Sequence, residues 1–192
     1  MSSPTYDLNF LRAGLQELKP YLLSTELFWP LDLSAPAGQP PYPKLTLGNL
    51  LLSLARLQAW PLDPQSQAEF TRLQAQLQLH RTQWRTAWEA KAGREFSSRL
   101  RQWSHTVNEF IQDPPNHAGA YPYQVRVRYL IERLSQELSS FSPDELEFLA
   151  NLDHRLRTVF VPGAFAWQDE LAASFDASLY WYLFGGLTST IG

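Results

Sequence analysis

The feature that most constrains the fold of this chain is the stretch of residues 65–112, which contains no proline and carries apolar side chains at helical spacing through most of its length. One helix of that length would span about 70 Å, at a rise of 1.5 Å per residue. That is about twice the core diameter expected for a domain of this size. The stretch is therefore predicted to protrude, to break or to pack against a partner.

The apolar side of this stretch changes along its length. A first stripe is formed by Phe70, Leu73, Leu77, His80, Trp84 and Ala87. Its continuation falls on poor core residues, namely Lys91, Arg94 and Ser98. A second stripe, displaced by two residues, is formed by Phe96, Leu100, Trp103, Val107 and Phe110. Two residues at about 100° each turn the apolar face by about 200° around the helix axis.

Gly93 lies where the two stripes meet, and it is the only helix breaker near that point. Either the helix breaks there into two angled or antiparallel helices, or one continuous or kinked helix buries opposite faces against different neighbours. The absence of a loop-forming sequence favours the continuous or kinked helix. That arrangement in turn favours a protruding arm or a dimer seam.

Apolar residues at spacings of three and four predict four further helices, over about 8–22, 44–59, 121–141 and 143–158. Pro20 lacks the N–H that would bond to a preceding carbonyl, so the first of these is expected to kink or restart there. Asp63 before Pro64 is a start signal for the long segment. Ser142 with Glu145 forms a capping-box pattern at the start of the last helix.

Two parts of the chain have weaker patterns. Residues 30–43 are rich in proline and form either a plain spacer or a stiff segment draped over a surface, with a short polyproline II stretch around Tyr42. After Val161, apolar residues recur every fourth position from Trp167, which predicts a helix, and a last helix is expected from Asp176 to Gly185-Gly186. Residues 179–184 also favour a strand, but no second strand of comparable quality is evident.

These patterns predict a single all-α domain over residues 1–192. The expected architecture is a bundle of five to seven helices, with one long central helix over about 64–112, a kink or break near Gly93 as the open alternative, and a Pro-rich loop at about 30–43.

Composition excludes several classes of function. The 192-residue chain has no cysteine, which rules out disulfides, thiolate nucleophiles and cysteine-ligated metals. Its net charge of -3 argues against a dedicated nucleic-acid binder, because phosphate contacts need a concentrated basic footprint. No signal peptide and no apolar stretch near the ~20 residues of a membrane span are evident, so a cytoplasmic location is expected.

The sequence contains no chemical motif. His105 and Glu109 form a His–carboxylate pair at i,i+4, but they lie off the apolar stripe and are expected to face water. The same holds for the row of Glu147, Asn151 and His154, opposite an apolar face. His80 falls on an apolar stripe and reads as a core or seam histidine. No metal or cofactor is expected, and catalysis is disfavoured without being excluded.

Two groups of aromatic residues are candidates for interaction. Trp84 and Trp88 stand one helical turn apart, and Tyr180-Trp181-Tyr182 point all round their element and cannot all face one core. They favour a non-catalytic protein–protein interaction or assembly subunit that self-associates. The alternative is a small-molecule-binding or catalytic bundle with an apolar pocket near His80 and Trp84. A third reading is a nucleic-acid accessory protein that uses Arg81, Arg85, Arg94, Arg99 and Arg101.

Overall fold

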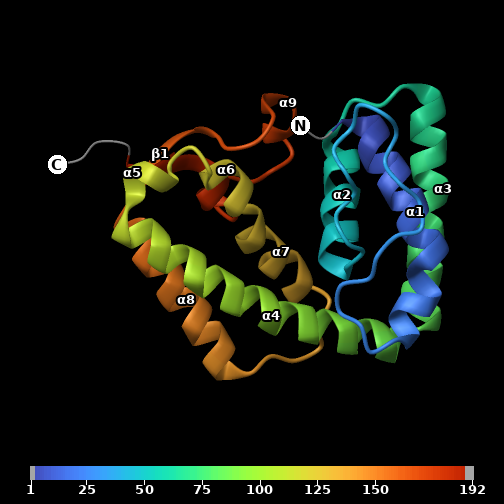
Figure 1. Ribbon diagram of the computed structural model, residues 1–192, viewed down its shortest axis with the longest axis horizontal. Helices are drawn as coiled ribbons and strands as arrows, with labels where there is room; N and C mark the ends of the chain where they lie inside the picture. The colour runs from blue at the N-terminus through green and yellow to red at the C-terminus, as the bar shows by residue number, and fades with distance from the viewer. Residues whose placement is uncertain (1–2, 189–192) are drawn as a thin grey trace. The chain divides into compact units, whose positions relative to one another are not determined.

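A computed structural model describes residues 3–188 of the chain (Figure 1). Its contacts divide the described chain into two compact units. Unit 1 runs to Glu95 and includes Gln136–Leu138, and unit 2 holds Phe96–Ser135 and the residues from Ser139 onward. Most of the described residues are helical and only one small sheet is present among them, which confirms the predicted all-α class. The single domain stays a prediction.

Unit 1 is built on three helices, α1 (Pro4–Leu23), α2 (Leu47–Ala59) and α3 (Pro64–Gln83), with α1 packed against both others (Figure 1). The leucines at three-four spacing in α1 and α2 are buried, as predicted. Gly14 allows α1 and α2 to approach closely, because a Cβ at that position would lie 2.6 Å from Leu50 Cδ2. Helix α1 continues through Pro20 to Leu23, so the expected restart does not occur.

The Pro-rich loop between α1 and α2 is confirmed as irregular chain. Its two ends are joined by reciprocal backbone hydrogen bonds between Trp29 and Leu45, at 3.1 and 2.7 Å. The ring of Tyr42 packs on α1, with its centroid 5.2 Å from that of Tyr6 and 5.6 Å from that of Phe10. These contacts hold the second half of the loop on unit 1.

The long proline-free stretch is two helices, and the predicted position of the break was wrong. The break lies at Trp84, whose φ of -115° and ψ of 34° separate α3 from α4 (Arg85–Gln112), while Gly93 sits inside α4 (Figure 1). Hydrogen bonds from Trp84 N–H to His80 and from Trp88 N–H to Trp84 persist on either side, so one residue turns the chain without a loop. The predicted change of apolar face is therefore made by a kink.

The reason for this position is visible in the burial of α4. Its apolar stripe starts one turn after the kink, and its buried members are Trp88, Ala92, Phe96, Leu100, Trp103, Val107 and Phe110. The part from Phe96 onward is the predicted second stripe. Trp88 belongs to it as well, so the two stripes meet between Leu77 and Trp88 rather than at Gly93.

Unit 2 contains the second part of α4 and the helices α5 (Pro114–His117), α6 (Tyr121–Gln124), α7 (Arg126–Ser135) and α8 (Pro143–Arg157). The rings of Phe110 and Tyr121 lie 5.5 Å apart and join α4 to α6. Helix α7 buries Val127, Leu130 and Leu134 as predicted but ends before Phe141. Ser142 takes the N-cap position of α8 without a side-chain capping bond.

The prediction of two helices after Val161 was wrong. Instead, β1 (Phe160–Phe165) pairs antiparallel with β2 (Phe184–Leu187), and only α9 (Asp169–Ala172) and the short 3₁₀ helix η1 (Trp181–Leu183) lie between them. Pro162 and Gly163 lie within β1. A two-stranded sheet has two edge strands, and an edge strand tolerates a proline because its N–H is not needed in the ladder.

Within residues 3–188 the structure has six helices of ten residues or more and three of four residues, slightly more than the five to seven expected. No helix in this range is both long and apolar enough to pass through a bilayer.

We predict that Gly93→Ala raises the free energy of unfolding by about 0.5–1 kcal/mol, because glycine is the poorer helix former and the new Cβ would meet only Leu138 Cδ2, at an ordinary 3.7 Å. Gly14→Ala is the control in the opposite direction, since its Cβ would clash with Leu50. Urea unfolding followed by circular dichroism measures both. A destabilised Gly93→Ala would show that α4 needs glycine there.

Candidate functional site

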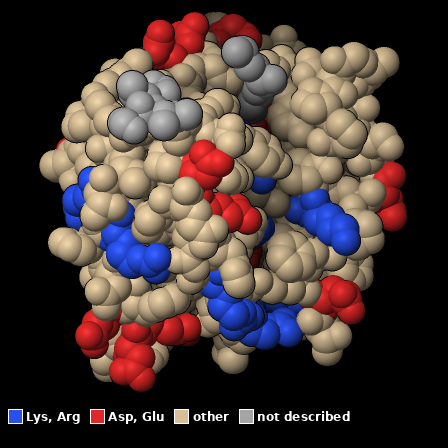
Figure 2. Space-filling model, turned by 60° about the vertical axis from the view of Figure 1, so that its left-hand side comes forward, with Lys and Arg blue, Asp and Glu red and all other residues tan. Residues whose placement is uncertain are grey.

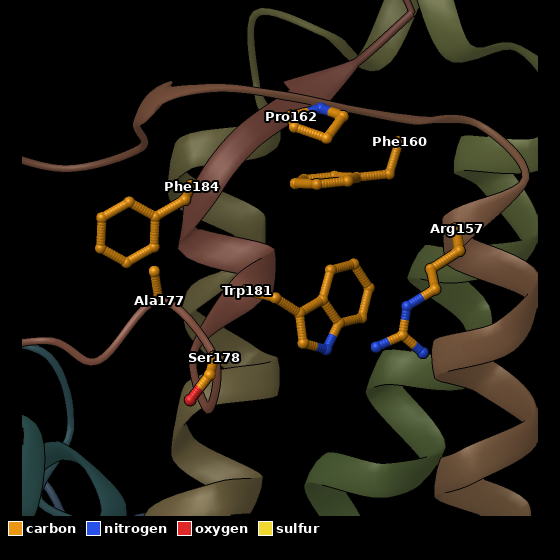
Figure 3. Close-up of a pocket in the computed structure, with 7 residues that line it drawn as sticks. All are labelled: Arg157, Phe160, Pro162, Ala177, Ser178, Trp181 and Phe184. Carbon is orange, nitrogen blue, oxygen red and sulfur yellow. The ribbon is translucent and has the colours of Figure 1, made fainter.

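The main candidate site is a groove of about 510 Å³ in unit 2, which we call the Trp181 groove (Figure 3). It is bounded by the end of α8, by β1 and β2, and by the turn that leads into η1. Its lining consists of Arg157, Phe160, Pro162, Ala177, Ser178, Trp181 and Phe184. The volume lies within the range typical of ligand-binding clefts.

Three of these side chains form a stack. The guanidinium carbon of Arg157 lies 4.0 Å from the ring centroid of Trp181, close enough for a cation–π interaction. On its other side Trp181 meets the ring of Phe160 edge to face, with centroids 5.2 Å apart and planes at 88°. In Figure 3 Phe160 lies above the indole, Arg157 lies beside it, and Phe184 lies on the opposite side of the indole from Arg157. Trp181 is partly buried and Arg157 is exposed.

Asp176 fixes the turn that brings Trp181 into the groove. Its carboxylate accepts hydrogen bonds from the backbone N–H and the hydroxyl of Ser178, at 2.8 and 2.7 Å. Its carbonyl accepts a bond from Tyr180 N–H at 2.8 Å. The bonds from Ser178 lower the pKa of Asp176, so the carboxylate stays charged over the physiological range. The sequence Asp-Ala-Ser is thus a self-satisfied turn.

Gly185 provides the floor against which Phe160 packs. Its φ of +156° lies in a region that side-chain-bearing residues rarely adopt. A Cβ there would lie 2.3 Å from Val161 O and 2.5 Å from Phe160 Cζ. The aromatic wall of the groove therefore depends on this glycine. Gly186, next to it, has open space where a Cβ would stand.

A buried polar network supports the groove from inside. Arg128 on α7 donates from Nε and Nη2 to the two carboxylate oxygens of Asp153 on α8, at 2.8 and 2.9 Å, and from Nη1 to Glu132 at 3.1 Å. Its guanidinium also lies 4.8 Å from the ring centroid of Tyr182, the residue after Trp181. Arg128 is buried and Glu132 is partly buried, and the bidentate bond to Asp153 is the stronger of the two contacts of Arg128.

Burial decides the charge states of this network. It raises the pKa of Tyr182 well above its usual value, although Arg128 acts in the opposite sense, so the phenol is neutral at physiological pH. Burial acts to lower the pKa of Arg128, but the bond to Asp153 outweighs it and the net shift is upward. The cation therefore stays charged, and the network is a structural support and no proton donor.

The predicted interaction residues lie in both units. Trp88, in unit 1, is 1% exposed, and its indole N–H donates to Glu137 Oε2 at 2.9 Å. Trp84 is partly buried, with Lys19 Nζ 5.5 Å from its ring centroid. In unit 2, Tyr182 is buried, whereas Tyr180 and Trp181 are partly buried. Of the five, Trp181 alone lines the groove.

A second groove, of about 470 Å³, lies in unit 1 between α1 and α3, and we call it the His80 groove. Its lining is Arg12, Leu15, Gln16, Arg72, Leu73, Gln76, Leu79, His80 and Gln83. The groove is thus polar as well as apolar, and Trp84 is not part of it, which differs from the apolar pocket expected near these two residues. His80 Nδ1 is buried and has no hydrogen-bond partner among the described residues.

Lys91, which falls on the poor continuation of the first stripe, and Glu95, one turn after it, are fully buried in unit 1, each 0% exposed. The ammonium of Lys91 donates to Ser24 O at 3.0 Å, to Ser24 Oγ at 3.2 Å and to Glu26 O, and lies 4.3 Å from the ring centroid of Tyr21. Burial, with a smaller effect of nearby Arg94, lowers the pKa of Lys91 to about 8.

The other polar residues considered from the sequence lie at the surface. Glu147, Asn151 and His154 are exposed on α8, as expected, and so are His105 and Glu109 on α4. Among the described residues no three histidine or acidic side chains come together in a way that would hold a metal ion.

The arginines of the nucleic-acid reading are largely engaged within the chain. Arg81 pairs with Glu137 at 2.9 Å, Arg85 pairs with Glu89 at 2.9 Å, and Arg94 donates to Thr25 O. Figure 2 shows basic and acidic side chains in several separate groups on the face that it presents. These observations describe no continuous basic surface on that face.

Sequence reasoning missed six of the seven residues of the Trp181 groove. Arg157 lies at the end of the helix predicted over about 143–158, and no element was predicted for Phe160 and Pro162. One signal was available: Phe160-Val161 and residues 179–184 both favour strands, and two such segments pair with each other. Lys91 and Glu95 were missed because a stripe of charged residues reads as solvent-facing.

No protein-family model, no curated protein and no solved structure matches this chain.

We predict that Lys91 makes stability depend on pH between about 8 and 10.5. The unfolded chain keeps this proton up to its ordinary pKa of 10.5, whereas the folded chain releases it near pH 8. Unfolding then takes up a proton in this window, so the free energy of unfolding rises with pH, with a slope of at most about 1.4 kcal/mol per pH unit. Below pH 8 both states are protonated and the slope vanishes.

The measurement is urea unfolding of the wild type and of Lys91→Met across this pH range. The variant should lack the rise that the wild type has. Lys44→Met, which removes an exposed lysine, is the matched control and should follow the wild type. Parallel curves for the wild type and Lys91→Met would contradict the prediction.

Proposed function

We propose that this chain is a non-catalytic protein–protein interaction or assembly subunit, located in the cytoplasm, that self-associates through the Trp181 groove. The observation that carries the proposal is the stack of Arg157, Trp181 and Phe160 at the edge of an open, mostly apolar groove. Tryptophan and arginine are the residues most enriched among those that dominate binding energy at protein interfaces.

The lining chemistry supports binding rather than proton transfer. Arg157 is the only ionisable side chain among the seven, and an arginine does not exchange its proton in the physiological range. The hydroxyl of Ser178 donates to Asp176, whose pKa is lowered, so this carboxylate is a poor base. What the groove offers a partner is aromatic surface and one positive charge.

The groove also has a rigid support, which lowers the entropy cost of binding. The Asp176 turn fixes the entry to η1, and the bidentate Arg128–Asp153 bond holds α7 and α8 behind it. Trp181 is followed by Tyr182 and Leu183, which are fully buried. Its backbone is therefore anchored on both sides while its ring stays accessible.

The test is the oligomeric state of Trp181→Ala. We expect the wild-type mass from light scattering to rise with concentration, and the variant to need at least tenfold higher concentration for the same mass, as for a residue that dominates an interface. Tyr123→Ala is the matched control. It removes another aromatic ring of unit 2 that carries an arginine, Arg126, at 4.9 Å from its centroid, but it lies outside the groove.

Circular dichroism and thermal melts of both variants show whether each is folded. Arg157→Glu serves as a second variant that leaves the aromatic rings in place, and it should weaken association in the same way. If the wild type stays monomeric up to its solubility limit, or if Trp181→Ala and Arg157→Glu both associate as it does, the proposal is wrong.

A second candidate function, binding of a small molecule, is favoured by the His80 groove. Its volume suits a small ligand, and Arg12, Arg72 and His80 would favour an anionic one. Arg12 is partly neutralised by its pair with Glu69, which weakens this candidate. A native mass spectrum should then contain a species heavier than the chain, and His80→Gln should lose it while His105→Gln, at an exposed histidine, retains it. A spectrum of the bare chain mass would contradict it.

A further inference from the structure

Building on the proposed function, we infer that the Trp181 groove binds the exposed segment 30–36 of a second copy of this chain, with Asp32 of that copy against Arg157. Three features of the described residues support this occupant: the exposure of segment 30–36, the chemistry of the groove, and the opposite charges of the segment and the groove.

The segment presents apolar side chains to solvent at a regular spacing. Pro30, Leu33 and Pro36 are exposed, and Leu33 has 51% of its surface accessible. Asp32 and Leu33 form a bend in the unbound segment, so we expect it to straighten on binding into a polyproline II conformation, whose three residues per turn place positions 30, 33 and 36 on one face. Leu31 and Ala35, between them, are partly buried. The exposed face therefore carries three apolar side chains and no core contact.

The backbone of this segment is available as well. In the described part of the chain, residues 30–36 belong to no helix or strand, and within the loop one backbone–backbone hydrogen bond joins Gln39 N–H to Pro36 O. The Trp29–Leu45 bridge and the packing of Tyr42 on α1 hold the two ends of the loop. The segment is thus presented on a fixed base, which reduces the entropy that binding removes.

The groove has the chemistry that such a segment requires. Proline-containing extended segments bind in grooves lined by aromatic rings, which contact the proline ring and the neighbouring apolar residue. The Trp181 groove offers the rings of Trp181, Phe160 and Phe184.

The charges are complementary. Among the described residues that line the groove, Arg157 is the only charged one, and Asp32 is the only charged residue of the sequence 30–43. The segment has no basic residue that would be repelled by Arg157. Asp32 is exposed and next to Leu33, so it reaches the groove rim when Leu33 enters the groove.

The first test uses a fluorescein-labelled peptide of residues 29–38, titrated with the full chain and followed by anisotropy. We expect saturable binding, at least fivefold weaker to Trp181→Ala and unchanged to Tyr123→Ala. A peptide with Leu33→Ala and Pro36→Ala should bind at least fivefold more weakly. Equal binding to the wild type and Trp181→Ala, or no binding, would overturn the inference.

The second test mixes two full-length variants. Trp181→Ala keeps the segment and loses the groove, whereas the Leu33→Ala, Pro36→Ala variant keeps the groove and loses the exposed face. Each alone should associate less than the wild type, and the mixture should form a heterodimer in light scattering, because each pair regains one segment-in-groove contact. Two grooves that bind each other directly would gain nothing from mixing.

Charge reversal tests the pairing. Asp32→Arg and Arg157→Glu should each weaken association, and the double variant should recover most of it, since each contact then has the opposite polarity. A double variant that associates no better than the single ones overturns the pairing.

These tests also separate the two levels of the proposal. If Trp181→Ala weakens self-association but the Leu33→Ala, Pro36→Ala variant and the peptide have no effect, the inference is wrong and the proposed function stands. If the wild-type chain does not associate at all, the proposed function itself is wrong.

Discussion

Unit 1 depends on the burial of two opposite charges one turn apart on α4. Lys91 donates to carbonyls just beyond the end of α1, and Glu95 accepts a bond from Gly48 N–H at the start of α2, at 2.9 Å. Each charge thus meets the helix end of opposite partial charge, which is the arrangement the helix dipole favours. A buried charge left without such partners would cost several kcal/mol. One face of α4 therefore holds the C-terminal end of α1 and the N-terminal end of α2.

The same interaction marks the limit of what the sequence could predict in this region. Leucine and aromatic stripes have a period that local sequence reveals, and those of α1, α2 and the second part of α4 are buried as expected. Lys91 and Glu95 bond to backbone groups 67 and 47 residues away, and a backbone group has no sequence signature. They were therefore placed in solvent. That error moved the apparent junction of the two stripes to Gly93, away from the kink at Trp84.

The prediction of helices in the C-terminal part of the chain was wrong for a different reason. Trp167, Leu171 and Phe175 recur every four residues, but Trp167 and Phe175 lie on either side of the short α9 and meet ring to ring, with centroids 5.6 Å apart. Both also pack on Tyr129 of α7. An aromatic cluster thus imitates a helical period. The sheet was hidden because Pro162 and Gly185, which read as turn residues, are tolerated in a two-stranded ladder where each strand is an edge.

Trp181 of the candidate site could be predicted from the sequence, whereas its contact with Arg157 could not. Three consecutive aromatic residues cannot face one core, and the structure resolves this by burying Tyr182 while Trp181 keeps part of its ring in the groove. Arg157 joins them only because α8 ends beside η1, 24 positions earlier in the chain. Tyr182 is buried, and its ring lies against the guanidinium of Arg128. The accessible ring and its buried neighbour are thus each paired with a guanidinium, so the stability of unit 2 and the shape of its groove depend on adjacent residues of one short turn.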